Sequence, residues 1–183
     1  MLASAADSLL VIIDTQERLA AAMVPAVLES MVANARILIR AAACLGVPVI
    51  ATEQYPKGLG PTVAELSGIL PAGTGRFEKT CFSCAGAELF PAALRASGRS
   101  QVVLAGMEAH VCVLQTALEL RAAGQVVFVV EDACCSRKQE NHANAIDRLR
   151  AGGVVVTNTE SVLFEWLRDA RHEHFKAIST LLR

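Results

Sequence analysis

The sequence lacks the features that mark membrane proteins and nucleic-acid-binding proteins. No apolar run approaches the roughly 18 residues of a transmembrane helix, and the longest ones are bounded by charges or glycines. Lys plus Arg is 17 against 18 for Asp plus Glu, a net charge of -1, and no run of like charge or basic stripe occurs. We therefore expect neither a membrane nor a nucleic-acid partner.

A basic leader is also missing. The first basic residue is Arg18, so no signal-peptide or transit-peptide pattern precedes the apolar stretch "SLLVIID". A cytoplasmic location is the default expectation. The six cysteines are expected to be reduced thiols, because a chain of this size can build a core without a disulfide framework.

The length and hydrophobicity predict a single domain over residues 1–183 that associates with itself. A chain of 183 residues can bury one sizeable core. Hydrophobic residues make up 53% of the chain, more than an average globular domain contains. Part of the surface is then covered by another subunit, so we expect a homo-oligomer.

Short apolar runs alternate with longer segments of helical period. The expected strands are residues 8–14, 47–52, 101–106, 125–130 and 153–158, with a less apolar sixth at 75–80. Several helical segments end in glycine, as a left-handed C-cap requires. This pattern predicts an α/β protein, a three-layer doubly wound fold with a six-stranded parallel sheet.

Chemically active side chains follow several of these strands. Asp14 ends the first expected strand, Lys79 lies near the end of the less apolar strand at 75–80, and Cys112 comes shortly after the strand at 101–106. Ligands of such folds bind beyond the carboxyl ends of the strands, so the three side chains should converge. A helix N-terminus and a nearby Lys favour the thiolate form of Cys112, while Asp14 can accept its proton. The set predicts covalent catalysis by a cysteine. A thiol packed at a strand-to-helix junction is the alternative.

The segments "LLVIIDTQ", "FEKTCFS" and "GMEAHVCVLQTALEL" together resemble the isochorismatase-like cysteine hydrolases. "TEQYPKGLGPTVAEL" and the ending "TESVLFEWLRDARHEHFKAIS" resemble the isochorismatase domain-containing branch of that family. The resemblance implies the isochorismatase-like hydrolase fold and a catalytic set of Asp14, Lys79 and Cys112. It implies hydrolysis of a small amide or related C–N bond through a covalent acyl-enzyme.

The same resemblance implies a non-proline cis peptide between Met107 and Glu108. This peptide bond would orient the backbone amides of Glu108 and Cys112 toward a developing oxyanion. Nicotinamidases of this family carry an Asp and His metal cluster after the second strand, whereas this chain has "EQYPKG" there and no histidine before His110. We expect no metal and no cofactor.

Other residues allow more than one interpretation. Gln16, Tyr55, Phe82 and His110 are candidates for lining a substrate pocket. His110 could instead be the base of a Cys-His pair, although residues two apart on a helix generally point away from each other.

The cysteines outside the predicted catalytic set allow several roles. "CFSC" has the spacing of a redox pair or half a zinc site, with Ser83 as a helix cap and packed thiols as the alternative. The roles of Cys81, Cys84, Cys134 and Cys135 stay open.

Two functions from different classes follow. The first is a cysteine hydrolase that acts on a small molecule, with Asp14 as the proton-transfer base and Lys79 as its electrostatic partner. The second is a catalytically silent binding or scaffold protein that retains the fold. The complete Asp, Lys and Cys set favours the enzyme.

Overall fold

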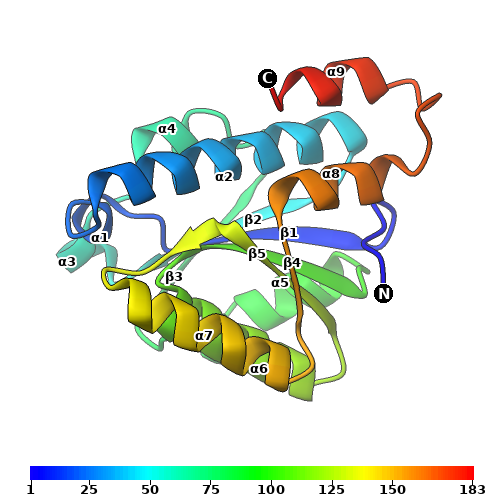
Figure 1. Cartoon of the computed structure of the whole chain (residues 1–183). Coiled ribbons are helices and arrows are strands. Elements are labelled where there is room, and N and C mark those ends of the chain that lie inside the picture. The colour runs from blue at the N-terminus through cyan, green and yellow to red at the C-terminus, as the bar shows by residue number, and fades with distance from the viewer.

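A parallel six-stranded sheet forms the middle layer of the molecule. The computed structural model describes all residues from 1 to 183, and the spatial strand order is β3-β2-β1-β4-β5-β6 (Figure 1). The strands are β1 (Ser8–Ile13), β2 (Val49–Gln54), β3 (Gly75–Lys79), β4 (Gln101–Met107), β5 (Val126–Cys135) and β6 (Val155–Thr157). All pairings are parallel.

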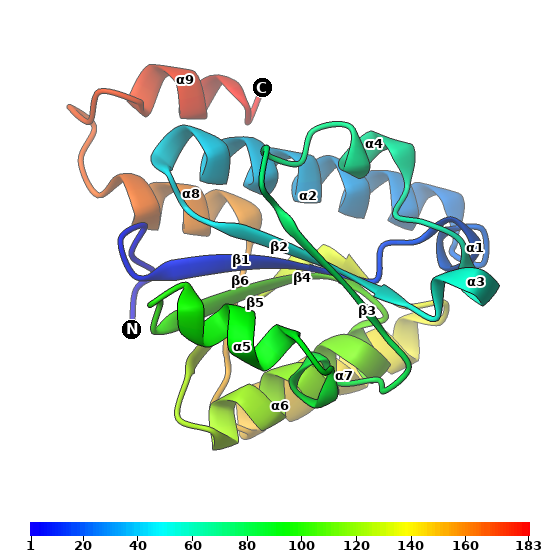
Figure 2. The same ribbon diagram turned by 180° about the vertical axis from the view of Figure 1, so that it is seen from behind.

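Helices cover both faces of this sheet, as Figure 2 shows from behind. The helices are α1 (Glu17–Ala20), α2 (Pro25–Leu45), α3 (Pro56–Leu59), α4 (Ala64–Ser67), α5 (Phe90–Ala96), α6 (Leu114–Ala122), α7 (Gln139–Ala151), α8 (Thr159–Leu167) and α9 (Phe175–Thr180). The layer formed by α2, α4, α8 and α9 covers one face, and α5, α6 and α7 cover the other. The predicted three-layer doubly wound fold is confirmed.

Strand β1 illustrates why the strands are apolar throughout. Leu10 and Ile12 pack into the core beneath α2 and α8, whereas Leu9, Val11 and Ile13 pack into the core beneath α5 to α7. Both faces are buried, so the alternation of polar and apolar residues that a half-exposed strand would show is absent.

The strand order changes direction between β1 and β4, which lie side by side at the centre of the sheet. Gly106 near the end of β4 pairs with Ile13 at the end of β1 and has a φ of 124°. A Cβ at Gly106 would overlap the Ile13 carbonyl oxygen. Glycine therefore permits the close approach of the two strands just before Asp14 and Met107. Ligands of doubly wound folds bind at this kind of switch point.

Two strands differ most in length from the prediction, and β2 begins and ends two residues later than predicted. β5 continues through "EDACC" to Cys135, and β6 is shortened to Val155–Thr157. After a register shift, Cys134 and Cys135 pair with Gly106 and Met107, so backbone pairing extends β5 beyond its apolar run. None of the helices is both long enough and apolar enough to cross a membrane.

Candidate active site

Asp14 and Lys79 form a buried ion pair at the carboxyl edge of the sheet. Lys79 Nζ lies 2.6 Å from Asp14 Oδ2, and both side chains are 0% exposed. The two residues come from β3 and from the end of β1, with β2 between them. The lysine side chain therefore crosses over the end of β2 to reach the carboxylate.

Every proton of the Lys79 ammonium has an acceptor inside the protein. Besides Asp14, Nζ donates to Gln54 Oε1 at 2.8 Å and to the carbonyl oxygen of Phe82 at 3.0 Å, with that of Cys81 farther away at 3.3 Å. Burial has the largest single effect on the pKa of Lys79 and lowers it. The nearby acidic groups Asp14, Cys112 and Cys84, with the hydrogen bond to Asp14, together outweigh burial, so the pKa is raised. The ammonium stays charged and has no proton left for a ligand.

Cys112 is near enough to this pair for both charges to act on its thiol. It belongs to a π-helical turn, Ala109–Val113, that leads directly into α6. Burial, then the negative charge of Asp14, raises the pKa of the Cys112 thiol, and hydrogen bonding to Asp14 adds to this, while Lys79 acts in the opposite direction. The structure thus brings Asp14, Lys79 and Cys112 together in one cluster.

One expectation about Cys112 is wrong. The helix N-terminus and Lys79 were expected to produce a thiolate, but the pKa of the thiol is raised. Cys112 is only 5% exposed and precedes α6 by two residues. Loss of hydration and the adjacent Asp14 carboxylate raise the pKa of the thiol more than the helix terminus and Lys79 lower it. The resting thiol therefore keeps its proton.

The turn before Cys112 is anchored through Glu108. The peptide bond between Met107 and Glu108 is cis. The Glu108 carbonyl accepts hydrogen bonds from the amides of Val111 and Val113 at 3.1 and 3.3 Å. Its buried carboxylate binds Arg137, with Nε at 2.9 Å and Nη2 at 3.2 Å. The oxyanion role of the Glu108 and Cys112 amides stays a prediction.

His110 is held away from the role of a base for Cys112. Its Nδ1 lies 3.0 Å from Ser136 Oγ, and its Nε2 lies 3.3 Å from Asn141 Nδ2. Both ring nitrogens are therefore engaged by residues beyond the end of β5 and on α7. This geometry does not favour His110 as the base of a Cys-His pair.

Gln16 does not line an open pocket. It is fully buried, its Nε2 donates to the carbonyls of Gln54 and Gly60, and its Oε1 accepts from the Gln54 amide. These bonds use the whole side chain, so Gln16 braces the end of β2 instead of contacting a ligand. Tyr55 and Phe82 are 55% and 53% exposed and remain candidates for contact with a ligand.

In the C-x-x-C segment Cys84 is a packed thiol and Cys81 is half-buried, and all six cysteines are free. Ser83 Oγ accepts a hydrogen bond from the Ala85 amide, which confirms its predicted role as a cap. Cys84 is buried, with Sγ 3.7 Å from Thr52 Oγ1. Burial raises the pKa of Cys84 to about 11. No three His, Cys, Asp or Glu side chains are grouped as a metal site.

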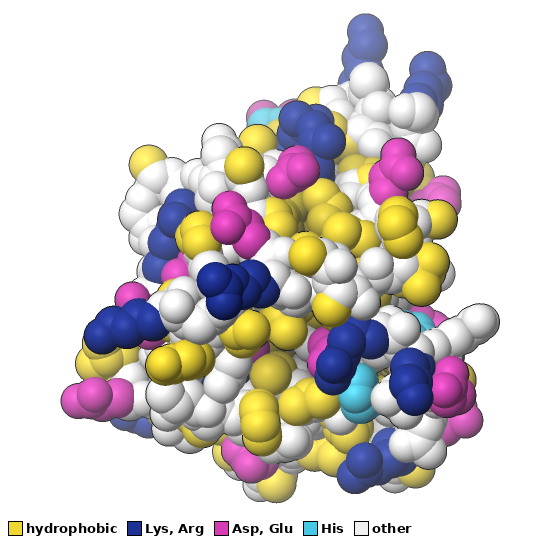
Figure 3. Space-filling model, turned by 90° about the vertical axis from the view of Figure 1, so that its left-hand side faces the viewer, with side chains coloured by type: hydrophobic (Ala, Val, Ile, Leu, Met, Phe, Trp, Pro, Cys, Tyr) yellow, Lys and Arg dark blue, Asp and Glu magenta, His cyan; other side chains and the backbone are white.

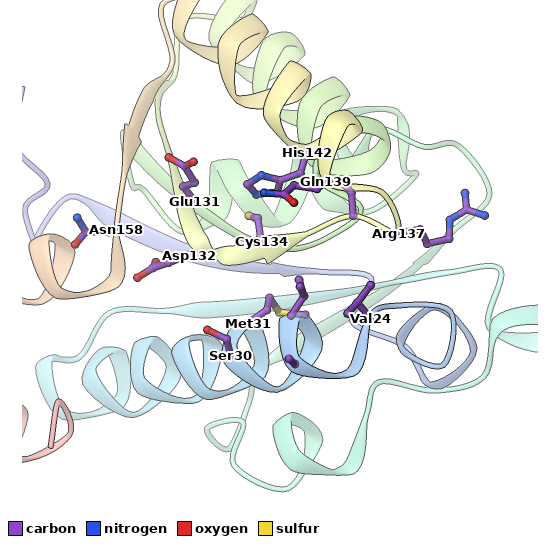
Figure 4. Close-up of a pocket in the computed structure, with 13 residues that line it drawn as sticks. Val24, Ser30, Met31, Glu131, Asp132, Cys134, Arg137, Gln139, His142 and Asn158 are labelled. Atoms are coloured by element: carbon purple, nitrogen blue, oxygen red, sulfur yellow. The ribbon is translucent and has the colours of Figure 1, made fainter.

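Two cavities lie near the carboxyl ends of the strands. One of about 480 Å³ is lined by Tyr55, Lys79 and Cys81, among others. Another of about 710 Å³ lies between the start of α2, the end of β5 and the start of α7, where Val24 and Met31 face Cys134 and His142 (Figure 4). Cys112 lines neither cavity. Lys79 lines the first of these cavities, and one open pocket shared by Asp14, Lys79 and Cys112 stays a prediction.

The face around the carboxyl ends of the strands is chemically mixed. Figure 3 shows hydrophobic side chains among interspersed basic and acidic ones, with no continuous basic area. Exposed large hydrophobic residues include Val24, Val27, Tyr55, Phe82 and Leu89. The surface near the cluster therefore suits a small polar or apolar molecule better than a polyanion.

Several residues of the cluster were not anticipated from the sequence. Thr52 and Gln54 on β2 bind Asp14 and Lys79 directly. Their position at the carboxyl end of a predicted strand is a signal that could have identified them. Cys84 and Thr116, by contrast, meet only through the tertiary structure, where the Cys84 amide donates to Thr116 Oγ1 at 2.9 Å.

Comparison with known proteins places the chain among relatives of the same fold. Residues 8–161 match the family model of the isochorismatase domain. Isochorismatase domain-containing protein 2 of Danio rerio is 40% identical over 182 residues, which cover 98% of this chain and 88% of that protein.

Solved structures give the same result. MAR1 ribonuclease from Caenorhabditis elegans is 35% identical with a TM-score of 0.92, over 100% of this chain and 92% of that one. YcaC from Escherichia coli, an octameric hydrolase of unknown specificity, is 26% identical with a TM-score of 0.91, over 100% and 89%. YcaC from Pseudomonas aeruginosa, solved with hexane-2,5-diol and covalent acrylamide, is 28% identical with a TM-score of 0.87, over 98% and 91%. By sequence and by fold, the chain belongs to the isochorismatase family.

Proposed function

We propose that this protein is a cysteine-dependent hydrolase of a small amide or a related C–N bond. The observation that carries the proposal is the buried Asp14–Lys79 pair at the switch point of the sheet, near enough to Cys112 for both charges to act on its thiol. A base, a fixed countercharge and a nucleophile are the groups that covalent acyl transfer needs.

The raised pKa of Cys112 defines the first chemical step. Because the thiol is protonated at rest, Asp14 takes its proton as the sulfur attacks the substrate carbonyl carbon. The carbonyl π electrons move to the oxygen, where the amides of Glu108 and Cys112 are the proposed donors. Lys79 keeps its positive charge throughout and stabilises the negative charge that passes from the carboxylate to the sulfur.

The second half of the reaction releases the product. Asp14 returns the proton to the leaving nitrogen, the C–N bond breaks, and a thioester on Cys112 remains. Water then attacks this thioester while Asp14 accepts its proton. The C–S bond breaks, the sulfur regains its proton from Asp14, and the acid is released. The cycle consumes one water and needs neither metal nor cofactor.

The relatives support a reactive nucleophile and self-association. The Pseudomonas aeruginosa protein was solved with covalent acrylamide, which is an electrophile that carries a primary amide. The Escherichia coli protein is described as an octamer. We extend both properties to this chain: a nucleophile that reacts with a small electrophile, and a homo-oligomer that covers part of its exposed hydrophobic surface.

RNA hydrolysis is a second candidate, because the Caenorhabditis elegans neighbour is described as a ribonuclease. Binding to a phosphate backbone depends on Lys and Arg contacts. This chain has a net charge of -1, and its basic residues are interspersed with acidic ones. The amide substrate is therefore preferred.

Acrylamide labelling tests the proposal without knowledge of the substrate. Mass spectrometry after limited labelling at neutral pH would rank the six thiols. We expect Cys112 to be modified before Cys44 and Cys81, although both of those are more exposed. Asp14→Asn should slow labelling of Cys112, because the base is lost, and His110→Ala should change it less.

The competing outcomes are distinct. If exposure alone governs labelling, Cys44 or Cys81 reacts first and Asp14→Asn has no effect, and the catalytic assignment fails. A screen of small amides and carbamoyl compounds, with an RNA substrate in parallel, then identifies the reaction. Turnover of RNA that survives Cys112→Ser would contradict the proposed mechanism. A reactive Cys112 with no turnover of any compound would favour the silent binding protein.

A further inference from the structure

Thr52 lies at the centre of a chain of buried hydrogen bonds around Asp14. Its side chain is 1% exposed, and its hydroxyl donates to Asp14 Oδ1 over 2.7 Å. An ionised carboxylate has no proton to donate, so the Thr52 proton points at Asp14 and the Thr52 oxygen is left as an acceptor. The chain of hydrogen bonds therefore has a defined direction.

Cys84 supplies the donor on the other side of Thr52. Its Sγ lies 3.7 Å from Thr52 Oγ1, and the raised pKa of about 11 keeps the S–H proton in place at neutral pH. The Cys84 amide donates to Thr116 Oγ1 at 2.9 Å. Thr116 follows Cys112 by four residues, which places the two on the same side of the helical segment.

These hydrogen bonds connect the proposed base, Asp14, to the helical segment that carries the proposed nucleophile, Cys112. From Asp14 the hydrogen bonds lead through Thr52 and Cys84 to Thr116, and the backbone of α6 leads back to Cys112. On the other side of the carboxylate, Lys79 holds Oδ2. The Asp14 carboxylate cannot turn without breaking one of two short buried bonds.

We infer that Thr52 is a positioning residue for the proposed reaction, which holds the Asp14 carboxylate in the orientation that accepts the Cys112 proton. Cys84 in turn holds the Thr52 hydroxyl in its donor orientation. The inference rests on the proposed function. In the first step the proton moves from Cys112 Sγ to Asp14 as the S–C bond forms, and Thr52 keeps its own proton throughout.

The hydroxyl of Thr52 is not required for packing. Thr52 lies on β2, whose preceding residues Val49, Ile50 and Ala51 are apolar and buried. Valine has nearly the same shape as threonine and is favoured in strands, but it lacks the hydroxyl. The substitution Thr52→Val therefore removes the hydroxyl that is proposed to position Asp14, while largely retaining the shape of the side chain.

The test is the pH dependence of acrylamide modification of Cys112 in the full chain. We expect Thr52→Val to slow modification at neutral pH by roughly tenfold, the size of a lost hydrogen bond to a charged group. The acidic limb of the rate profile should move to higher pH, because the carboxylate loses a bond that favours its ionised form. Thr52→Ser should restore the rate at neutral pH and the position of the acidic limb. Cys84→Ala should change both quantities in the same direction as Thr52→Val, but by less.

Thr159 offers a matched control. Its hydroxyl also donates to a carboxylate, Asp132 Oδ1, over 2.9 Å, and the residue is 2% exposed. Thr159→Val makes the same chemical change outside the cluster and should leave the Cys112 profile unaltered. If Thr159→Val and Thr52→Val have equal effects, the inference is overturned.

Other outcomes separate this inference from the proposed function. If Thr52→Val slows modification equally at every pH, or if Thr52→Ser fails to restore the profile, Thr52 has only a structural role. If Asp14→Asn slows modification while Thr52→Val does not, only this inference fails. If neither has an effect, the proposed function fails as well. Should Thr52→Val not fold, an unchanged profile in Cys84→Ala overturns the inference.

Discussion

Replacement of Lys79 by Met should destabilise the protein far more than removal of a surface lysine or arginine. Lys79 and Asp14 are both fully buried and lie 2.6 Å apart. Lys79→Met keeps most of the side-chain volume but leaves a buried carboxylate without its countercharge. Loss of one partner of a buried pair costs about 3–5 kcal/mol. For a chain of this length, that corresponds to a fall in Tm of about 6–20 °C.

The measurement is urea unfolding at pH 7 and constant protein concentration, because self-association would make the midpoint depend on concentration. Asp14→Asn alone should lower the free energy of unfolding by a similar amount, since it leaves a buried ammonium without an anion. The double variant should lose about 2–3 kcal/mol less than the sum of the singles, because neither charge is then left unpaired.

The surface pair of Arg150 and Glu131 provides the control. These side chains are 54% and 40% exposed and lie 3.0 Å apart. Arg150→Met should cost no more than about 1 kcal/mol. A loss in Lys79→Met that is no larger than in Arg150→Met, or strictly additive effects of Lys79→Met and Asp14→Asn, would refute the reasoning from burial.

Two further predictions concern alkaline pH and self-association. The pKa of Cys84 is raised from 9.0 to about 11, so its protonated form contributes stability that is fully present below pH 9 and is lost as the pH rises through about 11. Unfolding titrations should show wild-type stability falling over this window and a shallower fall in Cys84→Ala, and identical slopes would contradict the assignment. Light scattering at micromolar concentration should give a mass well above the 19.4 kDa of one chain, because 53% of the residues are hydrophobic. A mass of one chain would exclude the proposed oligomer.

The fold follows from local features of the sequence. Buried strands such as β1 are apolar on both faces, and helix α2 ends where Gly46 adopts a left-handed conformation with a φ of 67°. Such features depend on residues close together in the chain, which is why the sequence predicts them. The convergence of Asp14, Lys79 and Cys112 at one edge follows from the rule for strand ends in a parallel sheet.

The state of the site depends on distant contacts that no local pattern encodes. The sequence predicts a thiolate at Cys112, but burial by surrounding layers and the adjacent Asp14 raise the pKa of the thiol. Likewise, Gln16 is a polar residue after a strand, and only its bonds to Gln54 and Gly60 identify it as a brace. Desolvation and hydrogen-bond saturation are properties of the packed neighbourhood, so the pattern alone cannot supply them.

The sequence by itself therefore determined which chemical groups are present and on which edge of the sheet they lie, because strand periodicity and chain order fix that edge. Tertiary structure alone decided how those groups are joined. It placed Thr52 and Gln54 on the Asp14–Lys79 pair, and it brought Cys84 from the loop after β3 to Thr116 on α6. The physical reason is that a hydrogen bond requires atoms within about 3 Å, and only the folded layers bring segments so far apart in sequence to that distance.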